Sequence, residues 1–207
     1  MNILDVNLSL IIPELILASS IVLCSIVAIY ARFQVYLGFV LTQLGYFIAA
    51  VYLIFFKNTG GEAFHGLVYS SAPQDQFQLL VLLASFLTSF MLWDSYKKGG
   101  GWTIEAFIIL MGASLGGIIA LSSQHYLSLI IGLEMLSLLS YVLIALNKSS
   151  LESIRAAFKY FIIGALSSAL LFMGIAFMYG ATGELIYGAR IFPSGALNSH
   201  EQNLYLA

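Results

Sequence analysis

One residue of this sequence stands out as able to do chemistry: the carboxylic acid Glu134, in the middle of a long apolar run. Residues 127–146 read LSLIIGLEMLSLLSYVLIAL and hold no other charged side chain. A helix of about twenty residues rises roughly 30 Å, the thickness of the hydrocarbon core of a bilayer. Glu134 would then lie near the middle of a membrane, where a charge costs about 2.5–3.5 kcal/mol. Acids in such places usually mark ion or proton pathways.

Two hydroxyl-bearing residues are spaced to share the helix face of Glu134. Residues three, four and seven apart lie on one side of a helix, so Ser137 and Tyr141 are predicted to form a stripe with Glu134. A carboxylic acid followed by hydroxyls suits a proton relay, in which the acid takes up a proton in a dry environment and releases it beside a cation. The alternative is a neutral, hydrogen-bonded glutamic acid that only holds helices together.

Lys159 is the second candidate, because it lies about one turn into the next apolar run, 156–179. Its long side chain either reaches the membrane surface or turns inward to pair with a carboxylate, and the pattern favours neither. The sequence contains no HExxH, no GxSxG and no paired histidines for haem. The glycines at 99–101 lack the GK[ST] of a phosphate loop and indicate a turn. The single cysteine, Cys24, is interpreted as a small buried apolar residue.

The composition excludes a soluble protein. Of the 207 residues, 60% are hydrophobic and only 9% are charged, and the mean hydropathy is +0.96. An average globular domain carries about 25% charged residues, which it needs to cover its surface. The fold class is therefore all-α integral membrane. No basic tract indicates a nucleic-acid partner, and the partner that composition implies is the lipid bilayer.

Six apolar runs are long enough to be membrane helices. The expected helices cover residues 10–30, 35–56, 77–93, 104–121, 127–146 and 156–179. A polar loop is expected over 57–76. The first run lacks the positive flank of a secretory signal, so it is interpreted as a retained helix. The short connection over 122–126 predicts that the helices on either side of it are antiparallel neighbours.

Small residues recur every four positions in the run 104–121. Gly112, Gly116 and Ala120 form one row, and Ala113 and Gly117 form a second. Such rows let two helices approach closely in lipid, so the pattern predicts helix packing and no chemistry.

Three further ionisable residues lie at expected helix ends. Glu14 is interpreted as an interfacial acid near the positive pole of its helix, and Glu105 as an interfacial cap. His125 lies in a turn, where it is either simply solvated or titrates near neutral pH.

The positive residues predict the orientation in the membrane, because loops on the cytoplasmic side carry an excess of Lys and Arg. Six helices place both termini on one side. An external N-terminus leaves two cations outside, Lys57 and Arg190. It puts six inside: Arg32, Lys97, Lys98, Lys148, Arg155 and Lys159. The N-terminus is therefore predicted to be periplasmic in a bacterium.

Four motifs resemble a known family. They are 132–138 (GLEMLSL), 140–143 (SYVL), 156–165 (AAFKYFIIGA) and 179–183 (YGATG). Together they resemble the signatures GLELLSL-x-x-YVL, AALKYFLLGA and YGATG of subunit N of proton-pumping NADH–quinone oxidoreductase, or respiratory complex I. Pro13-Glu14 and Glu105 are compatible with that family, and the resemblance is strongest over 105–185.

The resemblance implies an antiporter-like fold of fourteen helices with two inverted five-helix repeats, the first beginning at the fourth helix. It also implies that Glu134 pairs with a lysine on a broken seventh helix, and that Lys159 matches a lysine of the sixth. The family binds no NADH, FMN, iron–sulfur cluster or quinone on this subunit. Those belong to partner subunits, and other membrane subunits of the complex are expected partners.

Under this resemblance, residues 1–103 hold the first three helices and 104–185 begin the first repeat. Residues 186–207 form a polar external tail that stops before the seventh helix. The chain by itself is then expected to lack a complete proton path. The leading hypothesis is a membrane subunit that takes part in proton translocation coupled to quinone reduction. The alternatives are a subunit of an Mrp-type cation/proton antiporter and a non-pumping remnant.

Overall fold

The computed structural model describes residues 8–30, 34–56, 61–64, 67–98, 103–147 and 150–186. These residues form six helices that are long and apolar enough to cross a membrane. The helices are α1 (Ile12–Tyr30), α2 (Gln34–Phe55), α3 (Ala72–Lys97), α4 (Ile104–Ser122), α5 (Tyr126–Ala145) and α6 (Leu151–Thr182). A short 3-10 helix, η1 (Leu8–Ile11), precedes α1, and two short strands, β1 (Gly61–Ala63) and β2 (Val68–Ser70), lie between α2 and α3. The predicted all-α membrane fold is confirmed.

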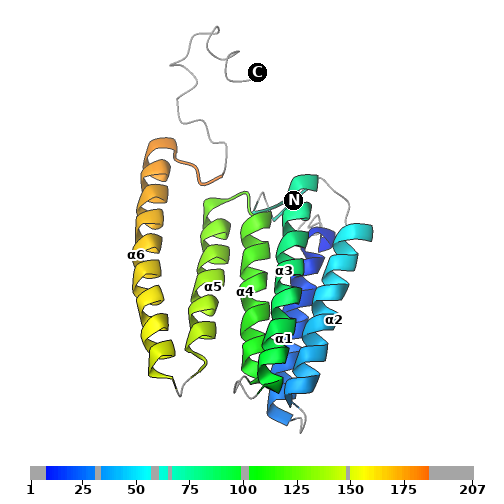
Figure 1. The fold of residues 1–207 in the computed structure, drawn as a ribbon. Coiled ribbons are helices and arrows are strands. Elements are labelled where there is room, and N and C mark those ends of the chain that lie inside the picture. Colours follow the sequence, from blue (N-terminus) through cyan, green and yellow to red (C-terminus); the bar gives the residue numbers. More distant parts are fainter. Residues whose placement is uncertain are drawn as a thin grey trace, which may run out of the picture.

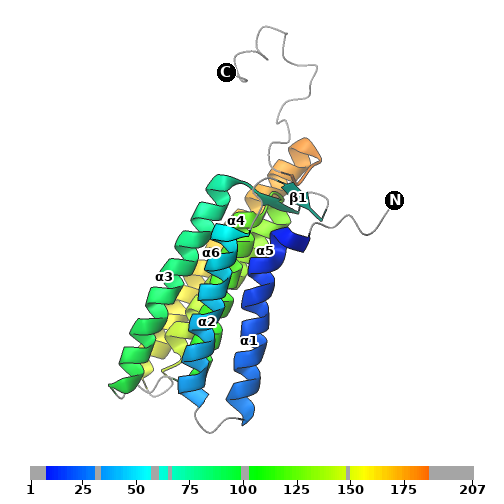
Figure 2. The same ribbon diagram turned by 90° about the vertical axis from the view of Figure 1, so that its right-hand side faces the viewer.

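The helices form a four-helix bundle with a two-helix extension. Helices α1 to α4 pack against one another, α5 packs along α4, and α6 lies on the outer side of α5 (Figure 1). A view from the side shows all six helices running in nearly the same direction or its opposite (Figure 2). Helix α5 therefore has α4 on one side and α6 on the other.

The core of the bundle is apolar and contains side chains of α1, α2, α3 and α4. Its fully or nearly buried members are Leu17, Cys24, Tyr46, Ala49, Leu53, Leu82, Met111, Leu115 and Ile118. The predicted burial of Cys24 is confirmed, with none of its surface exposed. At the opposite end of α2 from β1, aromatic rings pack together, and Phe39 stacks on Trp93 with a centroid distance of 4.8 Å.

Glycines set the contact between α4 and α5. A Cβ atom on Gly132 would lie 2.5 Å from the backbone nitrogen of Ala120 and 2.7 Å from the carbonyl oxygen of Gly116. The predicted row of Gly112, Gly116 and Ala120 thus faces α5, whereas a Cβ on Gly117 would face Val81 of α3. Residues later in α4 contact residues earlier in α5, so the two helices are antiparallel, as predicted.

Polar connections tie the helices together at one end of the molecule. The strands β1 and β2 form an antiparallel hairpin, and Val68 of β2 also bridges to Ser123 in the α4–α5 turn. The N–H of Tyr126, the first residue of α5, donates to the carbonyl of Leu185 beyond α6 at 2.8 Å. The polar loop expected over 57–76 contains this hairpin, and its last residues, from Ala72 onward, belong to α3 instead. A three-residue strand is too short for an alternating pattern to reveal.

Two helices extend beyond their predicted limits. Helix α3 begins five residues earlier than expected and ends four later, with Pro73 in its first turn. Helix α6 begins at Leu151 and ends at Thr182. The next residue, Gly183, has a left-handed backbone (φ 73°) that directs its N–H to the carbonyl of Tyr179. Hydropathy misses such ends because they carry the polar residues that satisfy free backbone groups.

Part of the predicted topology concerns segments that the structure does not describe. The cations Arg32, Lys57, Lys148 and Arg190, the glycines at 99–101 and the tail from 187 onward lie outside the described residues.

Candidate functional site

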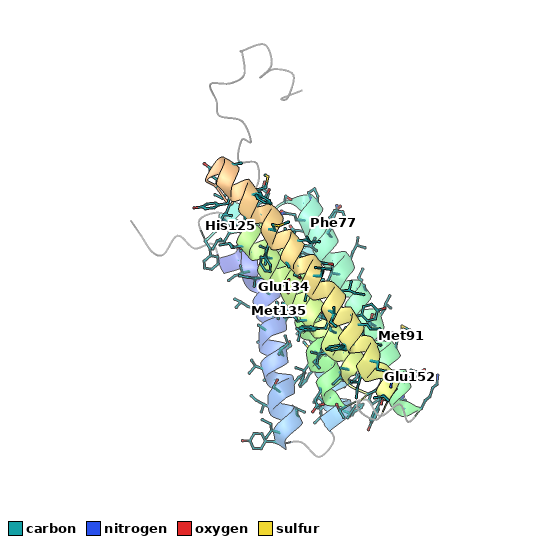
Figure 3. The ribbon with its side chains drawn as sticks, turned by 90° about the vertical axis from the view of Figure 1, so that its left-hand side faces the viewer. Phe77, Met91, His125, Glu134, Met135 and Glu152 are labelled. Carbon is teal, nitrogen blue, oxygen red and sulfur yellow. The ribbon has the colours of Figure 1, made fainter. Side chains whose placement is uncertain are left out.

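Glu134 lies in a groove between α5 and α6. It is the ninth of the 20 residues of α5, so it lies near the middle of that span. The groove has a volume of about 280 Å³. It is lined by Glu134, Leu138 and Tyr141 of α5 and by Phe161, Gly164, Ala165, Ser168, Ala169 and Phe172 of α6. We call this the α5–α6 groove. Figure 3 shows Glu134 part-way between His125, near one end of α5, and Glu152, near the opposite end of α6.

The α4–α5 contact determines which face of α5 the groove uses. Gly132, Met135, Leu136 and Leu139 lie against α4. At 100° per residue, these positions lie on the side of α5 opposite Glu134. The close glycine contact with α4 therefore turns Glu134 toward α6, where its side chain is half-buried.

Tyr141 reaches α6 because its neighbour there is a glycine. A Cβ atom on Gly164 would collide with the Tyr141 hydroxyl and lie 2.6 Å from the ring carbon that carries it. The ring thus occupies the place where a side chain at 164 would begin. Gly164 was singled out in the sequence only through the motif 156–165, and its role is to admit this tyrosine.

The predicted stripe of Glu134, Ser137 and Tyr141 is only partly reproduced. Glu134 and Tyr141 line the groove, but Ser137 does not. A rotation of 100° per residue places Ser137 about 60° to one side of Glu134 and Leu138 about 40° to the other. Helix periodicity defines a broad stripe, and the position of α6 decides which part of it faces the groove.

Ser168 of α6 lines the groove, and the sequence reasoning missed it as a candidate. It is one of many small residues in 156–179, which are typical of helix packing. A usable signal exists, because a short connection between α5 and α6 makes the helices antiparallel. Counting outward by equal steps from the ends of the two predicted runs, at 146 and 156, brings Ser168 to the level of Glu134.

Lys159 lies apart from Glu134. It is exposed and lines an open surface depression of about 490 Å³ with Glu152, Arg155, Tyr160 and other residues of α6 alone. Lys159 precedes Ser168 by nine residues, which is about 13 Å of helix rise. Lys159 and Glu134 line different pockets, and Glu152 is the carboxylate that shares a pocket with Lys159. The two interpretations of Lys159 stay predictions.

The remaining ionisable candidates occupy helix ends, as expected. Ser122 donates a hydrogen bond to Glu14 at 3.3 Å, and Thr103, which precedes α4, donates one to Glu105 at 3.0 Å. His125 is half-buried and caps α5, where its Nδ1 accepts from the N–H of Leu127 at 3.2 Å. Among the described residues, no group of three or more His, Cys, Asp or Glu side chains could hold a metal ion.

Comparison with known proteins agrees with this arrangement. A family described as NADH:quinone oxidoreductase/Mrp antiporter, TM matches residues 123–204. The NADH-quinone oxidoreductase subunit N of Bartonella bacilliformis is 32% identical over 180 residues, which are 86% of this chain and 37% of that protein. The subunit N of Neisseria gonorrhoeae is 35% identical over 191 residues, which are 89% of this chain and 39% of that protein.

This chain is a relative of the antiporter-like subunit N. A solved structure of respiratory complex I from Thermus thermophilus with bound Aureothin contains a chain of the same fold, with a TM-score of 0.73 and 29% identity. That match covers 86% of this chain and 39% of the other. The chain thus spans less than half the length of these subunit N relatives. The resemblance inferred from the four sequence motifs is confirmed.

Proposed function

We propose that this chain acts as a membrane subunit of an NADH–quinone oxidoreductase and takes part in proton translocation coupled to quinone reduction. The observation that carries the proposal is Glu134, a carboxylic acid held near the middle of a membrane span on a relative of subunit N. Apart from Lys159, the ninth of the 32 residues of α6, the other charged side chains on the described helices lie nearer to helix ends. A carboxylate kept at that depth costs free energy, which favours a role in proton transfer over one in packing.

Glu134 acts as the proton carrier in this proposal. A proton carrier needs a dry environment and a polar one. Apolar side chains line most of the α5–α6 groove, while Tyr141 and Ser168 offer hydroxyls. Lys159 acts in this proposal as a charged relay residue toward the start of α6, beside Glu152 and Arg155. It is not the direct partner of Glu134. The resemblance supplies that partner as a lysine of a following helix, with residues 104–185 as the start of the first antiporter-like repeat.

The redox chemistry belongs to partner subunits in this proposal. The sequence has no dinucleotide-binding fingerprint, and its one cysteine, Cys24, is buried among apolar side chains and cannot hold an iron–sulfur cluster. NADH, FMN, the clusters and quinone would therefore bind to other subunits. The excess of positive residues between alternate helices supports a bacterial inner membrane location with a periplasmic N-terminus.

Replacing Glu134 by glutamine in the intact membrane complex tests the proposal. A positioned proton-transfer group typically contributes about 10²–10⁴-fold to a rate, so we expect proton translocation to fall at least about tenfold. The measurement is the number of protons moved per quinone reduced in sealed vesicles, with assembly followed on native gels. Glu105→Gln is the matched control, because Glu105 is exposed in the first turn of α4. Normal pumping by an assembled Glu134→Gln complex would contradict the proposal and favour a remnant without transport.

The matching family description also covers Mrp antiporters, which supports a second candidate function, cation/proton exchange. The partners of the chain distinguish the two functions. Copurification with flavin- and iron–sulfur-containing subunits favours the oxidoreductase. Sodium-dependent proton movement without quinone reduction favours the antiporter.

A further inference from the structure

Three polar side chains face the α5–α6 groove from two different helices. Glu134 and Tyr141 come from α5, and Ser168 comes from α6. The remaining lining is aliphatic, aromatic or glycine. The polar atoms of the groove are therefore concentrated in these three side chains.

Ser168 lines the groove together with Glu134 and Tyr141, on the opposite helix. The helices are antiparallel, since Ser153 near the start of α6 donates to the carbonyl of Ile144 near the end of α5 at 3.1 Å. Tyr141 lies against Gly164, and Ser168 is one helical turn, about 6 Å, further toward the Glu134 end. Glu134 and Tyr141 are themselves about 10 Å apart along α5.

The hydroxyl of Ser168 is available, unlike those of most serines on these helices. Ser167 donates to the carbonyl of Ile163 at 2.9 Å, and Ser140 donates to that of Leu136 at 2.7 Å. Within the described part of the chain, Glu134, Tyr141 and Ser168 have no hydrogen-bond partner. An unsatisfied polar group at membrane depth costs several kcal/mol, so these three need partners. Water in the groove can supply them, beside the lysine of a following helix that the resemblance implies for Glu134.

The groove has room for bridging water. A water molecule takes about 30 Å³ in the liquid and needs two to four polar partners. The volume of about 280 Å³ exceeds the space that a few molecules require. A chain of water from the carboxyl of Glu134 through the Ser168 hydroxyl to Tyr141 satisfies all three groups.

We propose that Ser168 is the relay hydroxyl that connects Glu134 to Tyr141, so that the proton path crosses between α5 and α6 instead of following α5 alone. The inference rests on the proposed function. In each transfer, Ser168 accepts a proton on an oxygen lone pair as it releases its own hydroxyl proton to the next water, and it stays neutral between transfers. Ser137, which the sequence suggested for this role, does not line the groove.

The test replaces Ser168 in the intact membrane complex and measures protons moved per quinone reduced, in light and heavy water. We expect Ser168→Ala to lower this ratio several-fold and to change its solvent isotope effect. Ser168→Thr, which keeps the hydroxyl, should restore both. Ser167→Ala is the matched control, because Ser167 is exposed and bonded to its own helix. We expect it to pump like the parent.

Glu134→Gln, measured in parallel, separates this inference from the proposed function. If Glu134→Gln stops pumping while Ser168→Ala pumps normally, the relay assignment is overturned and the proposed function stands. If both pump normally, the proposed function fails and the relay fails with it. Failure of both Ser168→Ala and Ser168→Thr to assemble would assign Ser168 to packing and overturn the relay.

Discussion

The α1–α4 bundle and the α5–α6 pair are built of equally apolar helices but differ in what they bury. Within this chain 22–67% of the spans of α1 to α4 is buried, compared with 11% of that of α5 and 0% of that of α6. The bundle also pairs its internal polar groups, as Tyr46 does with Ser114 at 2.7 Å and Ser89 with Gln43 at 3.0 Å. The polar groups of the α5–α6 groove have no such partners among the described residues.

This difference distinguishes polar groups that hold helices together from polar groups that can take part in proton transfer. Polar side chains that are paired inside a closed core hold helices in register, and their bonded atoms do not exchange with water. Polar side chains beside an open groove keep that capacity, and the groove is where Glu134 lies. The proposed function places proton transfer in the extension, and the bundle then supplies the support on which α5 is mounted.

The largest expected effect comes from breaking the junction between the two regions. Gly132→Ala places a Cβ against backbone atoms of α4, which cannot swing away as a side chain would. We expect a loss of about 3 kcal/mol of unfolding free energy, the upper end of the cost of overpacking. Thermal unfolding of the purified chain in detergent measures it. Gly174→Ala is the control, since a Cβ there meets no atom within 4 Å. Equal unfolding temperatures for the two variants would disprove a tight junction.

A pair of leucine truncations compares the regions directly. Leu82 of α3 is 1% exposed in the bundle, whereas Leu170 of α6 is 58% exposed. Leu82→Ala leaves a cavity and should cost about 2 kcal/mol or more. Leu170→Ala should leave the stability of the chain nearly unchanged, because lipid or detergent fills the space. The same unfolding measurement applies, and a similar loss at both sites would mean that α6 is as tightly packed as the bundle.

The smallest effect is expected at a buried hydrogen bond of the bundle. Tyr46→Phe removes the bond between Tyr46 and Ser114 and should cost about 0.6 kcal/mol, the average for interhelical hydrogen bonds in membranes. Proton translocation by the complex should not change. Tyr36→Phe is the control on the same helix, because Tyr36 is 57% exposed. A Tyr46→Phe complex that assembles normally but pumps poorly would place part of the proton path in the bundle.

Apolar length and a few polar residues were enough to predict the six helices and the central position of Glu134. Bilayer thickness sets the length of a membrane helix, so both follow from counting residues. Close packing of the run 104–121 followed from Gly112, Gly116 and Ala120, because only small side chains permit backbones to touch. Their spacing along the chain carried that information. The short connection over 122–126 made the next helix the neighbour of this run.

The rotation of each helix about its own axis had to come from the tertiary structure. Leu80 and Leu82 of α3 are the same residue type, yet the first is 59% exposed and the second 1%. Lipid and protein core are both apolar, so hydrophobic periodicity does not distinguish the two sides of a membrane helix. Ser137 and Ser168 could therefore not be told apart as groove residues from local pattern. The sequence determined which residue carries the acid and how deep it lies, and the packing of α5 between α4 and α6 decided which hydroxyls share its groove.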